Sequence, residues 1–221
     1  MTAMSDDRCG DERSAYFMTA QRADPSLSPA PWAEVVPQAP FPMTVSDLLA
    51  WPDNDRYRYE VVEGVLVRLA GGKPRALFIA NRLYLALGSF VAAHGLGETT
   101  GADGVYDLDR RGQPNTGLLP DIGFIRADLL PHIDLDQVLT IPPDLAVEIA
   151  SENQYRPAMA RKARRYLDAG TRLVWIVYSR WQQVDVWRPG APDPTTLGLQ
   201  DTLDGEHVVP GFSYSVARLF G

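Results

Sequence analysis

Two acidic residues stand beside apolar runs, and their type and spacing make them the first candidates for chemistry. Asp121 follows Pro120 at the entrance to the run 122–125, and Glu148 interrupts the apolar run 145–150. A buried carboxylate costs free energy unless it is paired or holds a metal. Paired carboxylates on neighbouring strands suit a hard divalent cation, which prefers oxygen ligands. The pattern therefore favours Mg²⁺, with Mn²⁺ as the alternative, although Pro-Asp by itself is also an ordinary turn signature.

The alternation of side chains along a strand predicts the surroundings of Glu148. Ala146 and Ala150 share its face, whereas the larger apolar residues of the run point to the other face. Small neighbours leave room for a metal, a ligand or a partner side chain. The alternative is a structural salt bridge to an arginine of the next helix, and the pattern does not decide between the two.

A basic helix is expected to follow the acidic strand, from about residue 158 to residue 169. Lys162 and Tyr166 are four residues apart and therefore share one helical face. Lys162 could fold back over the acidic strand, where a lysine can orient a water or neutralise a charged transition state. Arg161 and Arg165 form the adjacent stripe. A solvated surface is the favoured interpretation of these arginines, and phosphate binding is their functional alternative.

Composition bounds the remaining possibilities. The 221 residues include 45% hydrophobic residues, which is typical of a globular protein. The net charge of −7 argues against a protein that coats nucleic acid through a general positive field, but it allows a local basic groove. One cysteine and three scattered histidines argue against a zinc site, and no Walker loop, dinucleotide fingerprint or nucleophile elbow is present. No apolar run approaches a membrane span, so a cytoplasmic protein without membrane contact is expected.

The elements that must position these residues are predicted as one mixed α/β (α+β) sheet flanked by helices. Residues 1–42 are proline-rich and are expected to be a flexible extension, with order beginning at Met43. We expect the following elements: a short helix with Thr44 and Asp47 as a capping box, hairpins 57–69 and 173–187, a core helix 77–93 ending at Gly95, and short strands near 105–108, 202 and 207–209.

The order of these motifs resembles a known family. Arg-Tyr-Glu-Val-Val-Glu-Gly at 58–64, Pro120-Asp121, the acidic strand 144–151, and Lys162 on the helix that follows are similar to the Uma-two-type restriction endonucleases of the PD-(D/E)XK nuclease superfamily. The resemblance covers roughly residues 43–221. It implies a single restriction-endonuclease-like domain with a central mixed sheet, flanking helices and extra β-hairpins. It also implies DNA as the substrate and a homodimer.

The resemblance also implies residue roles. Asp121 and Glu148 would bind Mg²⁺, and with Lys162 they would form the catalytic set, with Glu60 and Tyr166 as auxiliary residues. The superfamily places a lysine two residues after the second acid, where this chain has Ala150; the family commonly places its lysine on the next helix instead, as Lys162 does. The implied reaction is attack of a metal-activated water on a phosphodiester.

Two departures from the family pattern support an alternative. Ala76 stands where the family often has a histidine, and Ala158 stands where it often has an acid. The alternative is a catalytically reduced member that acts as a nucleic-acid-binding or protein-assembly module. A third hypothesis, a structural protein with a Glu148–arginine pair, requires Asp121 and Glu148 to lie far apart.

Overall fold

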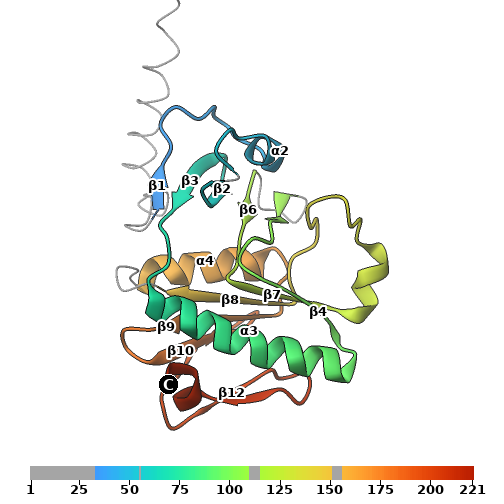
Figure 1. Cartoon of the computed structure of the whole chain (residues 1–221), viewed down its shortest axis with the longest axis vertical. Coiled ribbons are helices and arrows are strands. Elements are labelled where there is room, and N and C mark those ends of the chain that lie inside the picture. Colours follow the sequence, from blue (N-terminus) through green and yellow to red (C-terminus); the bar gives the residue numbers. More distant parts are fainter. Residues whose placement is uncertain (1–32, 55, 110–114, 151–155) are drawn as a thin grey trace, which may run out of the picture.

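The computed structural model describes residues 33–54, 56–109, 115–150 and 156–221 (Figure 1). The expected extension up to residue 32 and the segments 110–114 and 151–155 lie outside these residues. The described helices are α2 (Val45–Leu49), α3 (Pro74–His94), α4 (Arg156–Asp168), α5 (Val216–Phe220) and the 3-10 helix Ala127–His132.

Three sheets are present in the described part of the chain. The central sheet has the order β11-β10-β9-β8-β7-β4, with β4 (Gly97–Thr100), β7 (Ile122–Arg126), β8 (Leu145–Ala150), β9 (Leu173–Tyr178), β10 (Gln183–Trp187) and β11 (Thr195–Leu197). The second sheet has the order β1-β3-β2-β6-β5, with β1 (Ala33–Val35), β2 (Tyr59–Val62), β3 (Val65–Leu69), β5 (Tyr106–Asp107) and β6 (Gly117–Leu118). A small third sheet pairs β12 (Thr202–Asp204) with β13 (Ser213–Ser215).

The central sheet is mixed, as predicted. Strands β8 and β9 run parallel, whereas β7 and β8 run antiparallel. Two parallel neighbours need a crossover connection, and α4 supplies it. The helix that carries Lys162 is therefore brought back across one face of the strand that carries Glu148.

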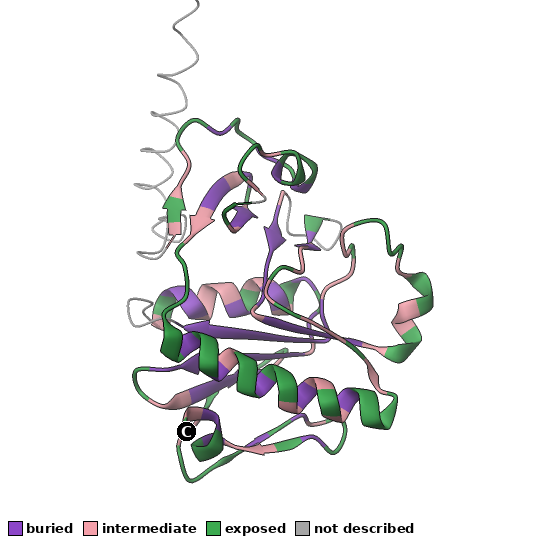
Figure 2. Ribbon diagram, viewed as in Figure 1, coloured by how far each residue is buried: buried purple, intermediate pink, exposed green. Residues whose placement is uncertain are grey.

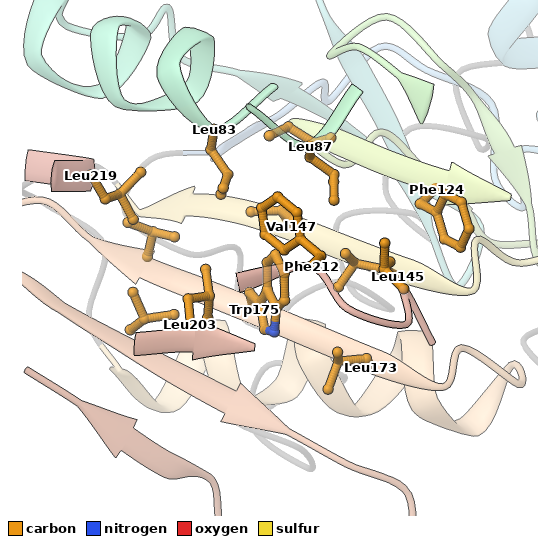
Figure 3. Packing of buried hydrophobic residues seen from close by; sticks show 14 of the residues in the cluster. Leu83, Leu87, Phe124, Leu145, Val147, Leu173, Trp175, Leu203, Phe212 and Leu219 are labelled. Carbon is orange, nitrogen blue, oxygen red and sulfur yellow. The ribbon is translucent and has the colours of Figure 1, made fainter. Parts of the chain in front are cut away.

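Two apolar layers cover the two faces of this sheet. The central strands β8 and β9 between them are buried along their whole length (Figure 2). The odd-numbered residues of β8 pack toward α3, where Leu83 and Leu87 lie over Val147 and Trp175 (Figure 3). The α3 residues in this layer recur at helical spacing, which gives the helix one buried stripe. The even-numbered residues of β8 face α4 instead, whose Ala163 and Tyr166 are fully buried.

The second sheet stands beside the first and begins earlier than expected (Figure 1). The hairpin β2–β3 turns at Glu63 and Gly64, both with positive φ, as the short glycine-containing connection predicts. Strand β1 pairs antiparallel with β3, and Ala39 is buried. The expectation that order begins at Met43 is therefore wrong for residues 33–42, because pairing with β3 gives this segment a partner that its own composition does not reveal.

Several boundaries also differ from the expectation. Helix α3 begins at Pro74 because proline is favoured in the first helical turn, and it ends at left-handed Gly95 as predicted. Residues 207–209 form turns instead of a strand. Helix α2 has the capping box of Thr44 and Asp47 that was predicted.

Helix α3 also corrects the expectation about membrane spans. Its 21 residues and a window of mean hydropathy 1.6 make it long and apolar enough to cross a membrane by length and composition alone. Core helices of proteins in water satisfy the same criterion, and the buried stripe of α3 packs on the central sheet.

Candidate active site

Asp121 lies directly before β7, and the strand register places it next to Glu148. Ile122 pairs with Val147 in the antiparallel ladder, so one further step brings Asp121 opposite Glu148. The Oδ2 atom of Asp121 accepts a hydrogen bond of 2.8 Å from the backbone N–H of Ile149. The two predicted acids are therefore cross-strand neighbours, and the third hypothesis, which needed them far apart, loses its premise.

Glu148 lies on the α4 face of β8, between Ala146 and Ala150, as the alternation predicted. It is 5% exposed. Its Oε1 atom accepts a hydrogen bond of 2.8 Å from the Tyr166 hydroxyl and lies 2.9 Å from Lys162 Nζ. The partner of Glu148 is thus a lysine of the following helix and not an arginine.

Lys162 joins two carboxylates that come from different sheets. Its Nζ atom lies 2.7 Å from Oε1 of Glu60 and 2.9 Å from Oε1 of Glu148. Glu60, on β2, is also held by the backbone N–H of Leu119 at 2.9 Å. Because α4 crosses the sheet beside β2, a single ammonium group bridges both acids, and Glu60 belongs to the site as the resemblance implied.

Burial and charge shift the titration of these groups. Burial raises the pKa of Glu148 to about 7, with Asp121 and Glu60 acting in the same direction and Lys162 opposing them. Burial alone would lower the pKa of Lys162, but Glu148 and Glu60 outweigh it and raise this pKa above its usual range. Burial and then the charge of Glu148 also raise the pKa of Tyr166 well above its usual value. Lys162 therefore stays charged, and Tyr166 stays a neutral donor.

Arg58 was not predicted, although it belongs to the site. Its Nη1 atom lies 3.6 Å from Oδ1 of Asp121, and its Nη2 atom donates to the carbonyl oxygens of Ala102 (2.7 Å) and Leu119 (3.4 Å). The sequence does hold a signal for it. Arg58 and Glu60 are two residues apart in a strand-like run, so both side chains point to the same face.

The two arginines beside Lys162 differ in their surroundings. Arg165 is only 16% exposed and pairs with Glu63 of the hairpin turn at 2.9 Å. The favoured interpretation of a solvated side chain is therefore wrong for Arg165, and a phosphate would have to compete with Glu63. Arg161 is half-buried, and a role in phosphate binding stays a prediction.

The candidate residues converge on one cavity of about 100 Å³. Asp121, Glu148 and Lys162 line it together with Arg58. The opposite wall comes from the loop after β3 and from the first turns of α3. Ala76 belongs to this wall, so the missing histidine would have faced the cavity, whereas Ala158 is buried within α4. The predicted catalytic set is thus brought to one place by β7, β8 and α4.

The donor set of this cavity fits a hard cation in part. Both acids offer carboxylate oxygens, which Mg²⁺ and Mn²⁺ prefer. Among the residues that the structure describes, no hydrogen bond reaches Oε2 of Glu148, and Oδ1 of Asp121 has only the 3.6 Å contact with Arg58. However, the described residues contain no group of three or more histidine, cysteine or acidic side chains placed to hold a metal. A cation here would rely on two carboxylates and on waters.

Comparisons with known proteins show the family of the chain and a shared fold. The Uma2 family, described as "Putative restriction endonuclease", matches residues 45–217. A solved structure from Anabaena variabilis ATCC 29413, titled a "putative nuclease belonging to DUF820", has 18% sequence identity and a TM-score of 0.69, and the match covers 81% of this chain and 98% of that chain. At this identity the likeness shows a shared fold. The comparison with curated proteins gave no match.

Proposed function

Because the chain belongs to the Uma2 family, whose description is "Putative restriction endonuclease", we propose that it is a metal-dependent endonuclease that hydrolyses DNA phosphodiester bonds. One observation carries the proposal: Asp121, Glu148 and Lys162 come from three separate elements and line the same cavity. Two acids and a lysine around one hollow are the groups that hydrolysis of a phosphodiester needs, namely ligands for a cation and a fixed positive charge.

Asp121 and Glu148 are the proposed ligands of Mg²⁺ or Mn²⁺. Oδ2 of Asp121 and Oε1 of Glu148 are engaged by the chain, which leaves Oδ1 and Oε2 as the oxygens to bind a cation. A bound divalent cation would supply a Lewis acid and would lower the pKa of a coordinated water toward neutrality. The hydrogen bond from Ile149 N–H and the one from the Tyr166 hydroxyl fix the orientation of the two carboxylates.

Lys162 is the proposed source of fixed positive charge. Its raised pKa keeps it protonated at neutral pH, so it can stabilise negative charge that develops on the phosphate oxygens. Glu60 holds the ammonium group at 2.7 Å and thereby limits where it can point. Arg58 lines the same cavity, so its guanidinium is a second positive group that can contact the phosphate.

Cleavage of supercoiled plasmid DNA with Mg²⁺, with Mn²⁺ and with a chelator tests the proposal. We expect cleavage by the wild type with either metal and none with the chelator. Asp121→Asn and Glu148→Gln should each lower the rate by at least about 100-fold, which corresponds to about 2.7 kcal/mol of lost transition-state stabilisation. Glu98→Gln is the matched control, because Glu98 is an exposed acid on β4 that does not line the cavity, and its rate should equal that of the wild type. Unchanged rates in both site variants would exclude this active site.

A binding or assembly module is the second candidate, and the ion pairing of the site favours it. Glu148 and Glu60 already share Lys162, and Asp121 lies near Arg58, so the cavity neutralises most of its own charge. Titration calorimetry with Mn²⁺ separates the two candidates. Heat of binding that disappears in Asp121→Asn supports the nuclease, whereas a folded wild type that releases no heat supports the module.

A further inference from the structure

A second hollow, of about 430 Å³, lies on the other side of the first turns of α3. We call it the α3–α5 groove. Arg75, Phe78 and Arg82 of α3 line one wall, Ser179 and Gln182 of the turn between β9 and β10 line another, and Phe220 of α5 contributes from the C-terminal end of the chain. None of these residues takes part in the candidate active site.

The groove and the active-site cavity are lined by residues near the carboxyl ends of two neighbouring strands, Glu148 and Ile149 in β8 and Ser179 directly after β9. Ala76, Leu77 and Ala80 face the active-site cavity, whereas Arg75 and Phe78 line the groove, so one stretch of α3 separates the two hollows. Strands β8 and β9, which lead to them, are parallel neighbours, and such strands lie about 4.8 Å apart.

A side-chain contact also joins the two strand ends. The Ser179 hydroxyl donates to the carbonyl oxygen of Ala150 at 3.2 Å, just two residues beyond Glu148. The two hollows are therefore reached from neighbouring strand ends.

The chemistry of the groove suits a phosphodiester backbone. Arg75 and Arg82 are seven residues apart on α3, which places them about 10 Å apart along the helix axis. Arg82 donates to the carbonyl oxygen of Leu219, and no ion pair of either arginine with a carboxylate occurs in the described part of the chain. The lining contains no acidic side chain. In a protein of net charge −7, two such guanidinium groups in one hollow provide a local site for anions.

The remaining lining residues match the other parts of a nucleotide. Phe78 is 60% exposed on the wall that carries both arginines. Exposed aromatic rings next to basic side chains bind sugars and bases of nucleic acid strands by stacking. Gln182 adds a neutral hydrogen-bonding group at the opposite wall, where the buried Ser179 hydroxyl is already bonded to Ala150.

We propose that the α3–α5 groove binds the nucleic-acid backbone on one side of the phosphate in the active site, with Arg75 and Arg82 contacting phosphate oxygens. This inference rests on the proposed nuclease function, because that function makes a nucleic acid the substrate. It adds a binding site that is separate from the catalytic residues.

The test is the salt dependence of DNA binding, measured by fluorescence anisotropy with a labelled DNA duplex and the matching single strand. All proteins carry Asp121→Asn so that cleavage does not consume the probe. We expect Arg75→Ala to weaken binding about 5- to 10-fold and to reduce the slope of log K against log salt by about one. Arg75→Lys, which keeps the charge, should keep the slope.

Two further variants separate a local effect from a general one. Gln182→Glu places an acid in the groove, at a residue whose φ is positive in the wild type. It should weaken DNA binding, as Arg75→Ala does, although Arg75 itself is unchanged. Arg164→Ala is the matched control, because Arg164 is an exposed arginine of α4 on the other face of the sheet and does not line the groove. Its affinity and slope should equal those of the parent protein.

The outcomes distinguish this inference from the proposed function. If the wild type cleaves DNA but Arg75→Ala and Gln182→Glu leave affinity and slope unchanged, the inference is overturned and the function stands. If the wild type never cleaves but both variants weaken binding as expected, the inference stands and the catalytic proposal fails. A parent protein that binds neither duplex nor single strand overturns the inference.

Discussion

Lys162 is the residue on which the candidate site depends for charge balance. Three acids, Asp121, Glu148 and Glu60, surround the cavity or its rim, and Lys162 and Arg58 are the cations that face them. Glu148 and Glu60 are about 95% buried, so each is costly without a partner. We therefore expect Lys162 to stabilise the fold, in addition to its proposed role in catalysis.

Replacing Lys162 should destabilise the protein strongly. We expect Lys162→Met to lower the free energy of unfolding at pH 8 by about 3–5 kcal/mol, because it leaves two buried carboxylates unpaired. A buried acid with a raised pKa stabilises the fold only while protonated, and this contribution is lost as the pH rises through the folded-state pKa, about 7 for Glu148. The difference from the wild type should therefore be smaller at pH 5. Urea denaturation at both pH values measures it.

A double variant and a control complete this experiment. Lys162→Met combined with Glu148→Gln should recover part of the lost stability, since one unpaired charge is removed. Arg164→Met, on the same helix, should change the free energy of unfolding by less than about 1 kcal/mol. A Lys162→Met protein as stable as the wild type would show that the bridge has no net effect on the fold.

At the residue scale, the sequence predicts side chains whose position follows from local periodicity. The sheet face on which Glu148 lies follows from the alternation of side chains along a strand. The approach of Lys162 to Glu148 follows from the placement of a helix directly after that strand. The ion pair of Arg165 with Glu63 could not be predicted, because the two residues are 102 positions apart and meet only through the packing of α4 beside the hairpin. The role of Asp121 and Glu148 as metal ligands stays a prediction.

At the scale of elements, Gly123 determines how closely the two sheets approach. It lies in β7, two residues after Asp121, and pairs with Thr100 of β4. The Tyr106 hydroxyl of the second sheet hydrogen-bonds Thr100 Oγ1 at 2.8 Å, directly above this glycine. A residue without a side chain is therefore needed where β5 meets the central sheet.

Adding a methyl group at Gly123 should push these elements apart. A Cβ atom there would lie 2.2 Å from the Tyr106 hydroxyl oxygen and 2.6 Å from Thr100 Oγ1. We expect Gly123→Ala to lower the free energy of unfolding by about 1–3 kcal/mol through overpacking. Gly101→Ala is the control, because no atom lies within 4 Å of the Cβ position at Gly101. Thermal denaturation of both variants tests this, and equal midpoints would contradict the role of Gly123.

Elements with a strong pattern of their own were predicted from the sequence, as were the short strands β5 and β12, whereas three other short strands were not. The long core helix, the two hairpins and the capped helix α2 each carry a local signal. Strands β1, β4 and β11 do not, because three or four residues form a strand only when a neighbouring strand offers hydrogen bonds. Residues 207–209 show the converse. Val208 and Val209 are buried and apolar, yet the segment forms turns and not the predicted strand.

At the scale of the whole molecule, three fully buried tyrosines occur on the α4 side of the central sheet. Tyr106, Tyr166 and Tyr178 all belong to the same apolar layer. Burial raises the pKa of Tyr106 to about 12, against an opposing hydrogen bond with Thr100, and burial also raises the pKa of the other two above the usual value. The folded protein therefore holds phenolic protons that the unfolded chain releases.

This difference predicts a loss of stability at alkaline pH. Because the unfolded tyrosines lose their protons near pH 10 and the folded ones retain them, stability falls as the pH rises above about 10. Each such group contributes up to about 1.4 kcal/mol per pH unit between its two pKa values. Urea denaturation at about pH 9, 10 and 11 should show the decline, and Tyr106→Phe should reduce its slope. A free energy of unfolding that is constant over this range would contradict the prediction.

The bridge between Lys162 and Glu60 has a consequence for the order of folding. It joins residues 102 positions apart, and Leu119 and Glu60, which are 59 positions apart, meet in the same place. Closing such long loops is slow and is favoured only when many distant contacts form together. While the chain is still assembling, each acid remains hydrated at little cost. We therefore expect this bridge to form late in folding, when α4 brings its ammonium group to both acids at once.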